Sequence, residues 1–168
     1  AEACVSHLLF DSSDYPELGA RIKCNPSIKT KTNRDALRQA VNSNLIDVIA
    51  TDHAPHSKEE KDKPLDQAPS GITGIETSLA LGVTELVEKG YLSMMQLLEK
   101  MTVNPAKLYN MEQGRLQEGK PADVVLFDPE EEWEVKEYKS KATNSPFTGW
   151  KLKGKVKYTI CDGKIIEL

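Results

Sequence analysis

The stretch VIATDHAPHSKEEK, residues 48–61, places an apolar run directly before a group of polar side chains. Val48–Ala50 is typical of a buried strand, and Asp52 and His53 follow at its carboxyl end. In parallel α/β folds the functional sites gather at these strand ends. A carboxylate in this place can bind a divalent metal, orient a histidine or take a proton from a metal-bound water. Spacing alone equally allows an aspartate that caps the next loop, with His53 and His56 as exposed loop residues, because D-H-x-x-H is not a specific metal motif.

The residues before this stretch predict a strand-helix-strand unit. A helix is expected over TNRDALRQAVNSN (residues 32–44), capped by Thr32 or Asn33 and ended by Asn44, because its apolar residues share one face. A strand over residues 45–50 follows it, and residues 1–10 form an earlier strand candidate. This alternation is the pattern of a parallel sheet. A further short strand is expected in ARIKCNPSI, residues 20–28, broken at the Asn-Pro pair.

The residues after the stretch divide into helices and then strands. A long polar loop over residues 56–74 precedes a helix in residues 75–90, and Ser93 is placed to cap the next helix. A short helix is expected to begin at Asn104-Pro105. Beyond residue 113 the pattern predicts strands, with a hairpin that turns at Asp162-Gly163. We therefore expect an α/β part over residues 1–112 and an all-β part over residues 113–168.

The composition excludes several classes of protein. The 168 residues are 39% hydrophobic and 29% charged, with a formal net charge of −4 and scattered lysines, which argues against a nucleic-acid surface. No run approaches the roughly 18 apolar residues of a membrane helix. Three cysteines without a CxxC pair indicate reduced thiols in a cytoplasmic protein.

The supply of metal ligands within the chain is small. It has three histidines, whereas a catalytic zinc site usually has three protein ligands. Besides His53 and His56 only His7 remains, and a lone histidine on a strand is more often a core residue than a ligand.

Two further segments carry groups that suit a small polar ligand. The loop PSGITG, residues 69–74, is either a flexible turn or a source of backbone N–H and C=O groups for a polar ring. Asn25 is either a turn residue or a side-chain amide that faces a substrate. No serine elbow, GxGxxG or phosphate loop is present in the sequence.

Five blocks in order carry a resemblance to a known family: IATDHAPHSKEEK, APSGITGIET, NPAKLYNM, GRLQEGKPADVVLFD and NSPFTGWKLKGKVKYTICDGKII. They closely resemble the C-terminal portion of the cyclic amidohydrolases, specifically the bacterial-type dihydroorotases. The resemblance implies the last strands and helices of a metal-dependent (β/α)₈ barrel in residues 1–112 and the C-terminal part of a β-sandwich in residues 113–168. It also implies the reversible cyclisation of N-carbamoyl-L-aspartate to L-dihydroorotate in cytoplasmic pyrimidine synthesis.

The resemblance assigns roles to individual residues. Asp52 matches the aspartate that binds the metal, one or two Zn²⁺ ions, and carries a proton to the leaving nitrogen. His56 and Asn25 match substrate contacts, and Pro69 and Gly71 match the loop whose backbone meets the ring. His53 is left as a structural neighbour.

The chain departs from the family pattern at two places. EACVSHL stands where the family commonly has E-V-T-P-H-H-L, and NPSIK stands for N-P-P-L-R, which exchanges a guanidinium for an ammonium. The other metal ligands of the family are expected upstream of residue 1, since a full barrel takes about 250 residues.

We therefore expect a fragment that is inactive alone, binds Zn²⁺ weakly and self-associates, or whose parent is a homo-oligomer. Two alternatives stay open: another cyclic amidohydrolase that acts on hydantoins or allantoin, and a non-catalytic amidohydrolase-like structural module.

Overall fold

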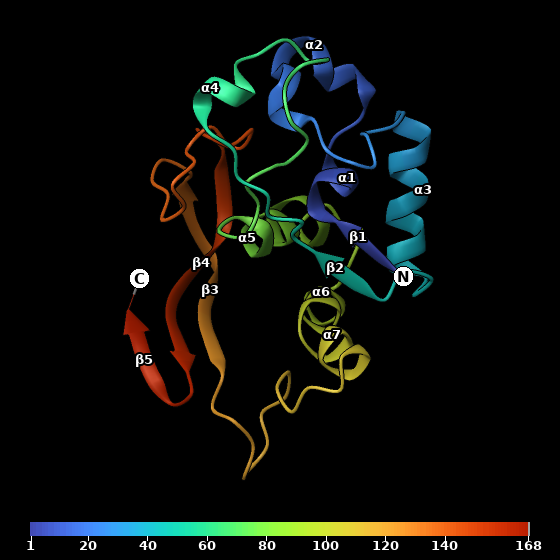
Figure 1. Cartoon of the computed structure of the whole chain (residues 1–168). Helices are drawn as coiled ribbons and strands as arrows, with labels where there is room; N and C mark the ends of the chain where they lie inside the picture. The colour runs from blue at the N-terminus through green and yellow to red at the C-terminus, as the bar shows by residue number, and fades with distance from the viewer. Residues whose placement is uncertain (168) are drawn as a thin grey trace.

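The first part of the chain forms a parallel strand-helix-strand unit, as the sequence predicts. In the computed structural model, which describes residues 1–167, strand β1 (Glu2–Cys4) pairs with β2 (Val48–Ala50). Helix α3 (Lys31–Asn42) is the last helix in the connection between them and lies beside the pair (Figure 1). Its N-cap is Thr30, so the cap predicted at Thr32 or Asn33 is wrong. The register joins Glu2 to Val48 and Cys4 to Ala50, so both strands end at the same edge of the sheet. The α/β class is confirmed.

The strand predicted over residues 1–10 is wrong beyond Cys4, because residues 5–9 form helix α1 (Val5–Leu9). Val5, Leu8 and Leu9 are all buried, and their spacing is that of one helix face. The loose apolar pattern fits either element, and the tertiary structure decides between them. Since the pairing with β2 stops at Ala50, residues 5–9 have no strand beside them to complete their backbone hydrogen bonds.

The strand predicted over residues 20–28 is also wrong. After α1 the chain forms η1 (Ser12–Asp14), α2 (Tyr15–Leu18) and η2 (Gly19–Ile22), and residues 23–30 are irregular. Their backbone groups bind loops and side chains instead of a neighbouring strand. The Lys23 carbonyl accepts a hydrogen bond from the Gly71 N–H (2.8 Å), and the Lys29 carbonyl accepts one from Ser12 (2.7 Å).

Short helices follow β2: α4 (Lys58–Lys61), α5 (Ser78–Gly82), η3 (Val83–Val87), α6 (Met94–Met101) and α7 (Val103–Leu108). The predicted cap at Ser93 is confirmed, since its hydroxyl accepts the Gln96 N–H (3.2 Å) in a capping box. The helix predicted over residues 75–90 begins at Ser78 and widens to a π-helix in η3. There the Thr84 hydroxyl accepts the Lys153 N–H (2.8 Å). In residues 1–167 no helix is long and apolar enough to cross a membrane.

The last part of the chain is an antiparallel sheet in the order β3 (Val124–Glu134), β4 (Lys151–Cys161) and β5 (Lys164–Glu167). The predicted hairpin is confirmed. Asp162 and Gly163 both have positive φ (48° and 73°), which is the geometry of a tight two-residue turn. Leu168, the end of the predicted hairpin, lies outside the described residues. The division into domains at residue 112 stays a prediction.

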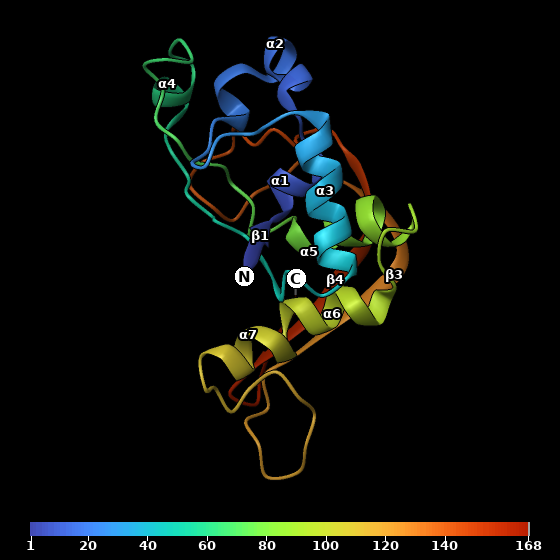
Figure 2. The ribbon, with the colours of Figure 1, turned by 90° about the vertical axis from the view of Figure 1, so that its right-hand side faces the viewer.

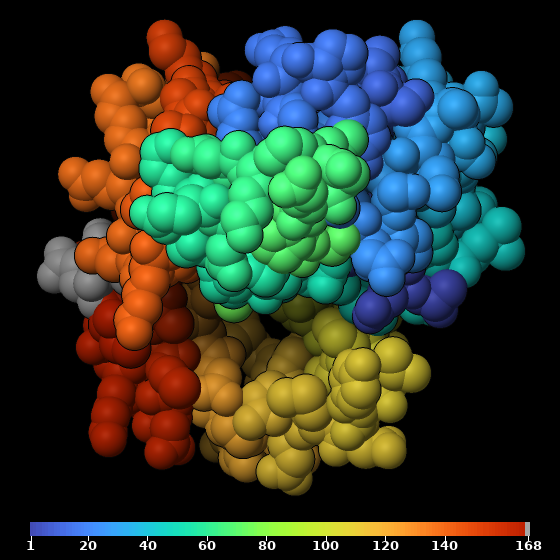
Figure 3. Space-filling view, turned by 45° about the horizontal axis from the view of Figure 1, so that its top comes forward, coloured from blue at the N-terminus to red at the C-terminus, as the bar shows by residue number. Residues whose placement is uncertain are grey.

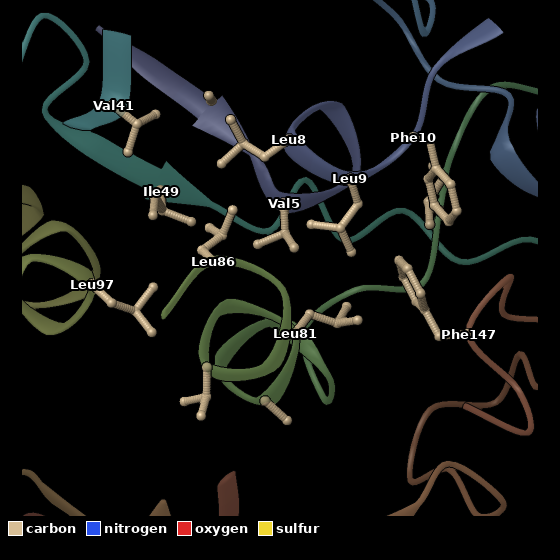
Figure 4. Close-up of a cluster of buried hydrophobic side chains, with 14 of the residues drawn as sticks. Val5, Leu8, Leu9, Phe10, Val41, Ile49, Leu81, Leu86, Leu97 and Phe147 are labelled. Carbon is tan, nitrogen blue, oxygen red and sulfur yellow. The ribbon is translucent and has the colours of Figure 1, made fainter. Parts of the chain in front are cut away.

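One hydrophobic core joins the two parts. Helix α1 contributes Val5 and Leu9, which point toward Leu81 of α5 (Figure 4). Phe10 stacks on Phe147, whose ring lies in the loop before β4 (centroids 5.5 Å apart). Helix α5 and η3 pack against β4, and Figure 2 shows these elements from the side. The β part is therefore held on the helices of the α/β part by apolar contacts.

An open apolar groove lies between the sheet and helices α6 and α7. Its volume is about 1260 Å³, and Figure 3 shows the hollow between these helices and the strands. Large exposed apolar side chains lie nearby, among them Met95, Leu116 and Val125. Self-association through such surfaces stays a prediction.

Candidate functional site

Asp52 lies two residues beyond the end of β2, where the chain leaves the parallel pair. Its backbone has φ +46°, the left-handed region that Asp and Asn tolerate better than most residues. The residue is exposed, so its carboxylate is open to a ligand. The strand end therefore presents a single carboxylate, as the sequence predicts.

Two thiols, Cys4 and Cys24, lie close enough to Asp52 for its negative charge to raise their pKa values. Burial raises the pKa of Cys4 to about 11, and the Asp52 and Glu2 carboxylates add to the rise. Burial likewise raises the pKa of Cys24 to about 11, again with help from Asp52. Because the thiolate is the reactive form, neither cysteine is a nucleophile near neutral pH. Cys24 is buried, whereas Cys4 is only half-buried.

His7 lies beside Cys24 and is held by the backbone. Its Nε2 is 2.7 Å from the Pro26 carbonyl oxygen, to which it donates, and 3.6 Å from the Cys24 sulfur. The Cys24 thiol also donates to that carbonyl (3.2 Å). The ring thus makes a structural contact, but it is half-buried on helix α1 and does not lie in the core on a strand, where the sequence predicts it.

His53 holds the loop that follows residue 71. Its Nδ1 accepts the N–H groups of Gly74 (3.2 Å) and Ile75 (3.3 Å), so the ring proton belongs on Nε2. That Nε2 lies 3.4 Å from the Ser140 hydroxyl. His53 also forms a parallel bridge with Ile72. The side chain therefore connects the strand end to two other segments, which supports a structural role.

A clasp of three residues, His53, Ser140 and Glu76, ties the strand end to the loop between β3 and β4. The Glu76 carboxylate accepts hydrogen bonds from Lys139 N–H (2.7 Å), Ser140 N–H (3.0 Å) and the Ser140 hydroxyl (2.7 Å). Burial acts to raise the pKa of Glu76, but these hydrogen bonds and the nearby His53 outweigh it, and the net pKa is lowered. The sequence reasoning missed this clasp, since its members lie 64 residues apart at Glu76 and Ser140.

Replacing Glu76 with glutamine is expected to destabilise the chain at neutral pH. Hydrogen bonds to a charged group are worth about 1.5–3 kcal/mol, and solvent screening at this exposed site reduces the expected loss to about 1 kcal/mol. Because the folded pKa is lowered, the stabilisation is present above the unfolded carboxyl pKa and is lost as the pH falls through the folded value. Urea unfolding of both chains at pH 7 and below about pH 4 measures the difference in their free energies of unfolding.

The matched control for this prediction is Glu118→Gln, at an exposed carboxylate outside the clasp. Its free energy of unfolding should stay near that of the unaltered chain at both pH values. An equal loss in the two variants, or a loss in Glu76→Gln that does not shrink in acid, would contradict the role of the Glu76 charge.

The remaining predicted residues come together beside the strand end. The His56 Nε2 lies 3.1 Å from the Ser70 carbonyl oxygen, and its Nδ1 lies 3.5 Å from a Glu60 carboxylate oxygen. Gly71 packs so closely on residue 54 that no side chain fits at its place. Its N–H binds the carbonyl of Lys23, two residues before the exposed Asn25. The segments of Asn25, His56 and Pro69–Gly71 are therefore neighbours, and their substrate contacts stay predictions.

The residues described here do not make a complete metal site. Within residues 1–167 no three His, Cys, Asp or Glu side chains are grouped so that they could hold an ion. His53 and His56 direct ring nitrogens at backbone groups, as the distances above show. Asp52 is left as the candidate ligand that the chain offers.

The arrangement defines an α/β protein whose candidate site is an exposed carboxylate at the end of a parallel strand, flanked by a glycine-containing loop. The chain belongs to the amidohydrolase family, whose model matches residues 6–166.

Similar sequences and structures support this assignment. The chain is 56% identical over 166 residues to a dihydroorotase of Clostridioides difficile (strain 630), and 52% identical over 167 residues to one of Lactococcus lactis subsp. lactis (strain IL1403). Both matches cover 99% of this chain, which spans 39% and 40% of these curated relatives. Among solved structures, an L-hydantoinase (dihydropyrimidinase) from Arthrobacter aurescens matches with TM-score 0.87 and 29% identity, over 99% of this chain and 38% of that one. A dihydropyrimidinase from Brevibacillus agri NCHU1002 matches with TM-score 0.90 and 26% identity, with the same coverage.

Proposed function

We propose that this chain is part of a dihydroorotase, which hydrolyses L-dihydroorotate reversibly to N-carbamoyl-L-aspartate in pyrimidine biosynthesis. The observation that carries the proposal is the 52–56% identity to two dihydroorotases across nearly the whole chain. Because the chain spans about 40% of these relatives, the activity is proposed for a protein that contains the matching remainder, and the chain alone is expected to be inactive.

We further propose that residues 1–112 are the C-terminal part of a (β/α)₈ barrel and residues 113–168 belong to a β-sandwich. The parallel pair β1-β2 and the antiparallel sheet β3-β4-β5 support this division. The open groove beside the sheet supports the view that further protein surface covers it, and self-association of the isolated chain is the corresponding expectation. Three free cysteines support a cytoplasmic location.

Asp52 is the proposed catalytic residue. As a general base its carboxylate takes the proton of the attacking water, and as a general acid it returns that proton to the leaving ring nitrogen. Its exposure at the strand end supports the role, since a proton carrier must reach the reacting atoms. We propose that Asp52 is also this chain's ligand to one or two Zn²⁺ ions. The described residues do not complete that site.

Four other residues are proposed to contact the substrate. The Asn25 amide and the His56 ring face its carboxylate or ring, and the backbone at Pro69 and Gly71 meets the ring. The proximity of these segments supports the proposal. The His56 Nε2 is directed at Ser70, so this histidine also shapes the loop that carries Pro69 and Gly71.

A second candidate is hydrolysis of hydantoins or dihydropyrimidines, which the likeness to an L-hydantoinase and a dihydropyrimidinase favours. The lower identity of these matches, 26–29%, makes it the weaker of the two. A non-catalytic structural role is the third candidate. A chimera that folds but turns over no substrate would support it.

A chimera tests the proposal, in which this chain replaces the matching segment of the C. difficile dihydroorotase. We expect L-dihydroorotate turnover within about tenfold of the parent enzyme, and hydantoin turnover lower by a factor on the order of 10², because a site that pairs polar substrate groups rejects analogues that lack them. A spectrophotometric assay with dihydroorotate, hydantoin and allantoin measures this. A folded chimera that prefers hydantoin or turns over none of the three would refute the proposal.

A further inference from the structure

The four consecutive carbonyl oxygens of residues 68–71, in the loop that contains Gly71, accept hydrogen bonds from side chains outside this segment. Lys23 Nζ donates to Ala68 (2.6 Å), and Lys61 Nζ donates to Pro69 (3.1 Å) and Gly71 (2.8 Å). His56 Nε2 completes the run at Ser70 (3.1 Å). Lys23 Nζ also binds the Leu65 carbonyl (2.7 Å). Each carbonyl oxygen of residues 68–71 therefore accepts a hydrogen bond from one of three side chains, and its second lone pair can still accept one from a ligand.

Lys61 is an unusual residue to find in such a place. Its side chain is 6% exposed, and lysine is seldom buried without a carboxylate partner. In the part of the chain that the structure describes, neither Lys61 nor Lys23 makes an ion pair. Burial, and then the charge of Lys23, lower the pKa of Lys61. The two ammonium groups thus lie near each other, and the hydrogen bonds that they donate within residues 1–167 go to carbonyl oxygens.

Stability alone does not account for this arrangement. A buried charge loses its hydration, and apolar residues of similar volume often serve stability as well or better. The two ammonium groups instead orient the backbone, because each binds two carbonyl oxygens and so holds both of them toward one point. Lys23 contributes a second constraint, since its own carbonyl accepts the Gly71 N–H (2.8 Å). The loop is consequently held from both sides of its backbone.

We propose that Lys23 and Lys61 are positioning residues that set the backbone conformation of residues 68–71 and thereby present Pro69 and Gly71 to the substrate. The substrate part of this inference rests on the proposed function, whereas the effect on the loop does not. Both lysines act through the loop and touch no reacting atom.

Amide hydrogen exchange of the 168-residue chain tests the effect on the loop. Lys61→Met keeps the long apolar stem and removes the ammonium group, and we expect exchange at the Ala68 and Gly71 amides to rise about tenfold, since locally opened segments exchange faster. Lys63→Met, at an exposed lysine two residues away, is the matched control and should leave exchange unchanged. Lys23→Met, at a less buried position, gives a second reading if Lys61→Met does not fold. Unchanged protection in the folded lysine variants would overturn the proposal.

Kinetics in the chimera test the substrate part. We expect Lys61→Met to raise KM for dihydroorotate about tenfold while kcat changes by less than about threefold, because the loop binds the ring and Asp52 is untouched. A merely structural role would lower the amount of folded enzyme, and hence the apparent kcat, without moving KM. An active chimera with unchanged KM overturns the proposal. An inactive unaltered chimera refutes the proposed function instead, and the exchange experiment then decides the inference about the loop.

Discussion

Asp52→Asn in the chimera is expected to lower kcat for L-dihydroorotate by about 10³-fold, within the range that general acid–base groups supply. The asparagine amide has nearly the same shape but cannot take up the proton of the attacking water. It also tolerates the left-handed backbone at φ +46°, so the exchange should leave the fold intact. Steady-state kinetics, with a thermal melt of the same sample, separate lost chemistry from lost structure.

Asp66→Asn is the matched control for this variant. Asp66 is an exposed aspartate in the loop that follows the same strand end, and the same chemical change there should leave kcat unaltered. If Asp52→Asn kept more than about a tenth of the activity, a contribution of the size expected for a general acid–base group would be absent. The assignment of Asp52 would then be wrong.

Gly71→Ala is expected to lower the free energy of unfolding of the chain by about 3 kcal/mol or more, the size of effect seen when a substitution forces backbone to move. Gly71 has φ +148°, which L side chains rarely adopt. A Cβ there would lie 2.4 Å from the Ala54 carbonyl oxygen and 2.8 Å from the His56 ring. The first of these atoms is backbone at the strand end, so it cannot turn aside. Urea unfolding monitored by circular dichroism measures the loss.

Gly90→Ala separates backbone strain from the clash. Gly90 also has a positive φ (+74°), but no atom lies within 4 Å of a Cβ placed there. We expect it to cost about 1 kcal/mol, the ordinary penalty for alanine at a position that favours glycine. Equal losses at the two positions would show that the close approach of Gly71 to Ala54 does not restrict the loop.

Local sequence patterns were sufficient for several elements of the fold. The apolar face in residues 32–44 predicted α3, the Ser93 cap was confirmed by its capping box, and Asp162-Gly163 forms the expected turn. Each of these signals acts within about one turn of chain. The patterns failed where residues 5–9 and 20–28 had no partner strand. They also failed in η3, where contact with β4 accompanies the π-helical turn.

For the candidate site, position along a strand was predictable and mutual arrangement was not. The end of an apolar run identified Asp52, and the family resemblance assigned substrate contacts to Asn25, His56, Pro69 and Gly71. The Glu76–Ser140 contact and the lysine contacts to residues 68–71 were missed, because their members lie on different segments. No local signal marks a lysine that will donate to carbonyls some 45 residues away, as Lys23 does.

The sequence by itself determined the strand-helix-strand unit, the placement of an aspartate at the strand end and the resemblance to the cyclic amidohydrolases. These depend on periodicity and on residue types at short spacing, which act through local backbone preferences. The tertiary structure alone decided which polar groups satisfy one another: His53 holds residues 74 and 75, Glu76 holds Ser140, and Lys61 holds residues 69 and 71. Buried polar groups must find partners wherever the folded chain places them, and that placement follows from packing between segments distant in sequence.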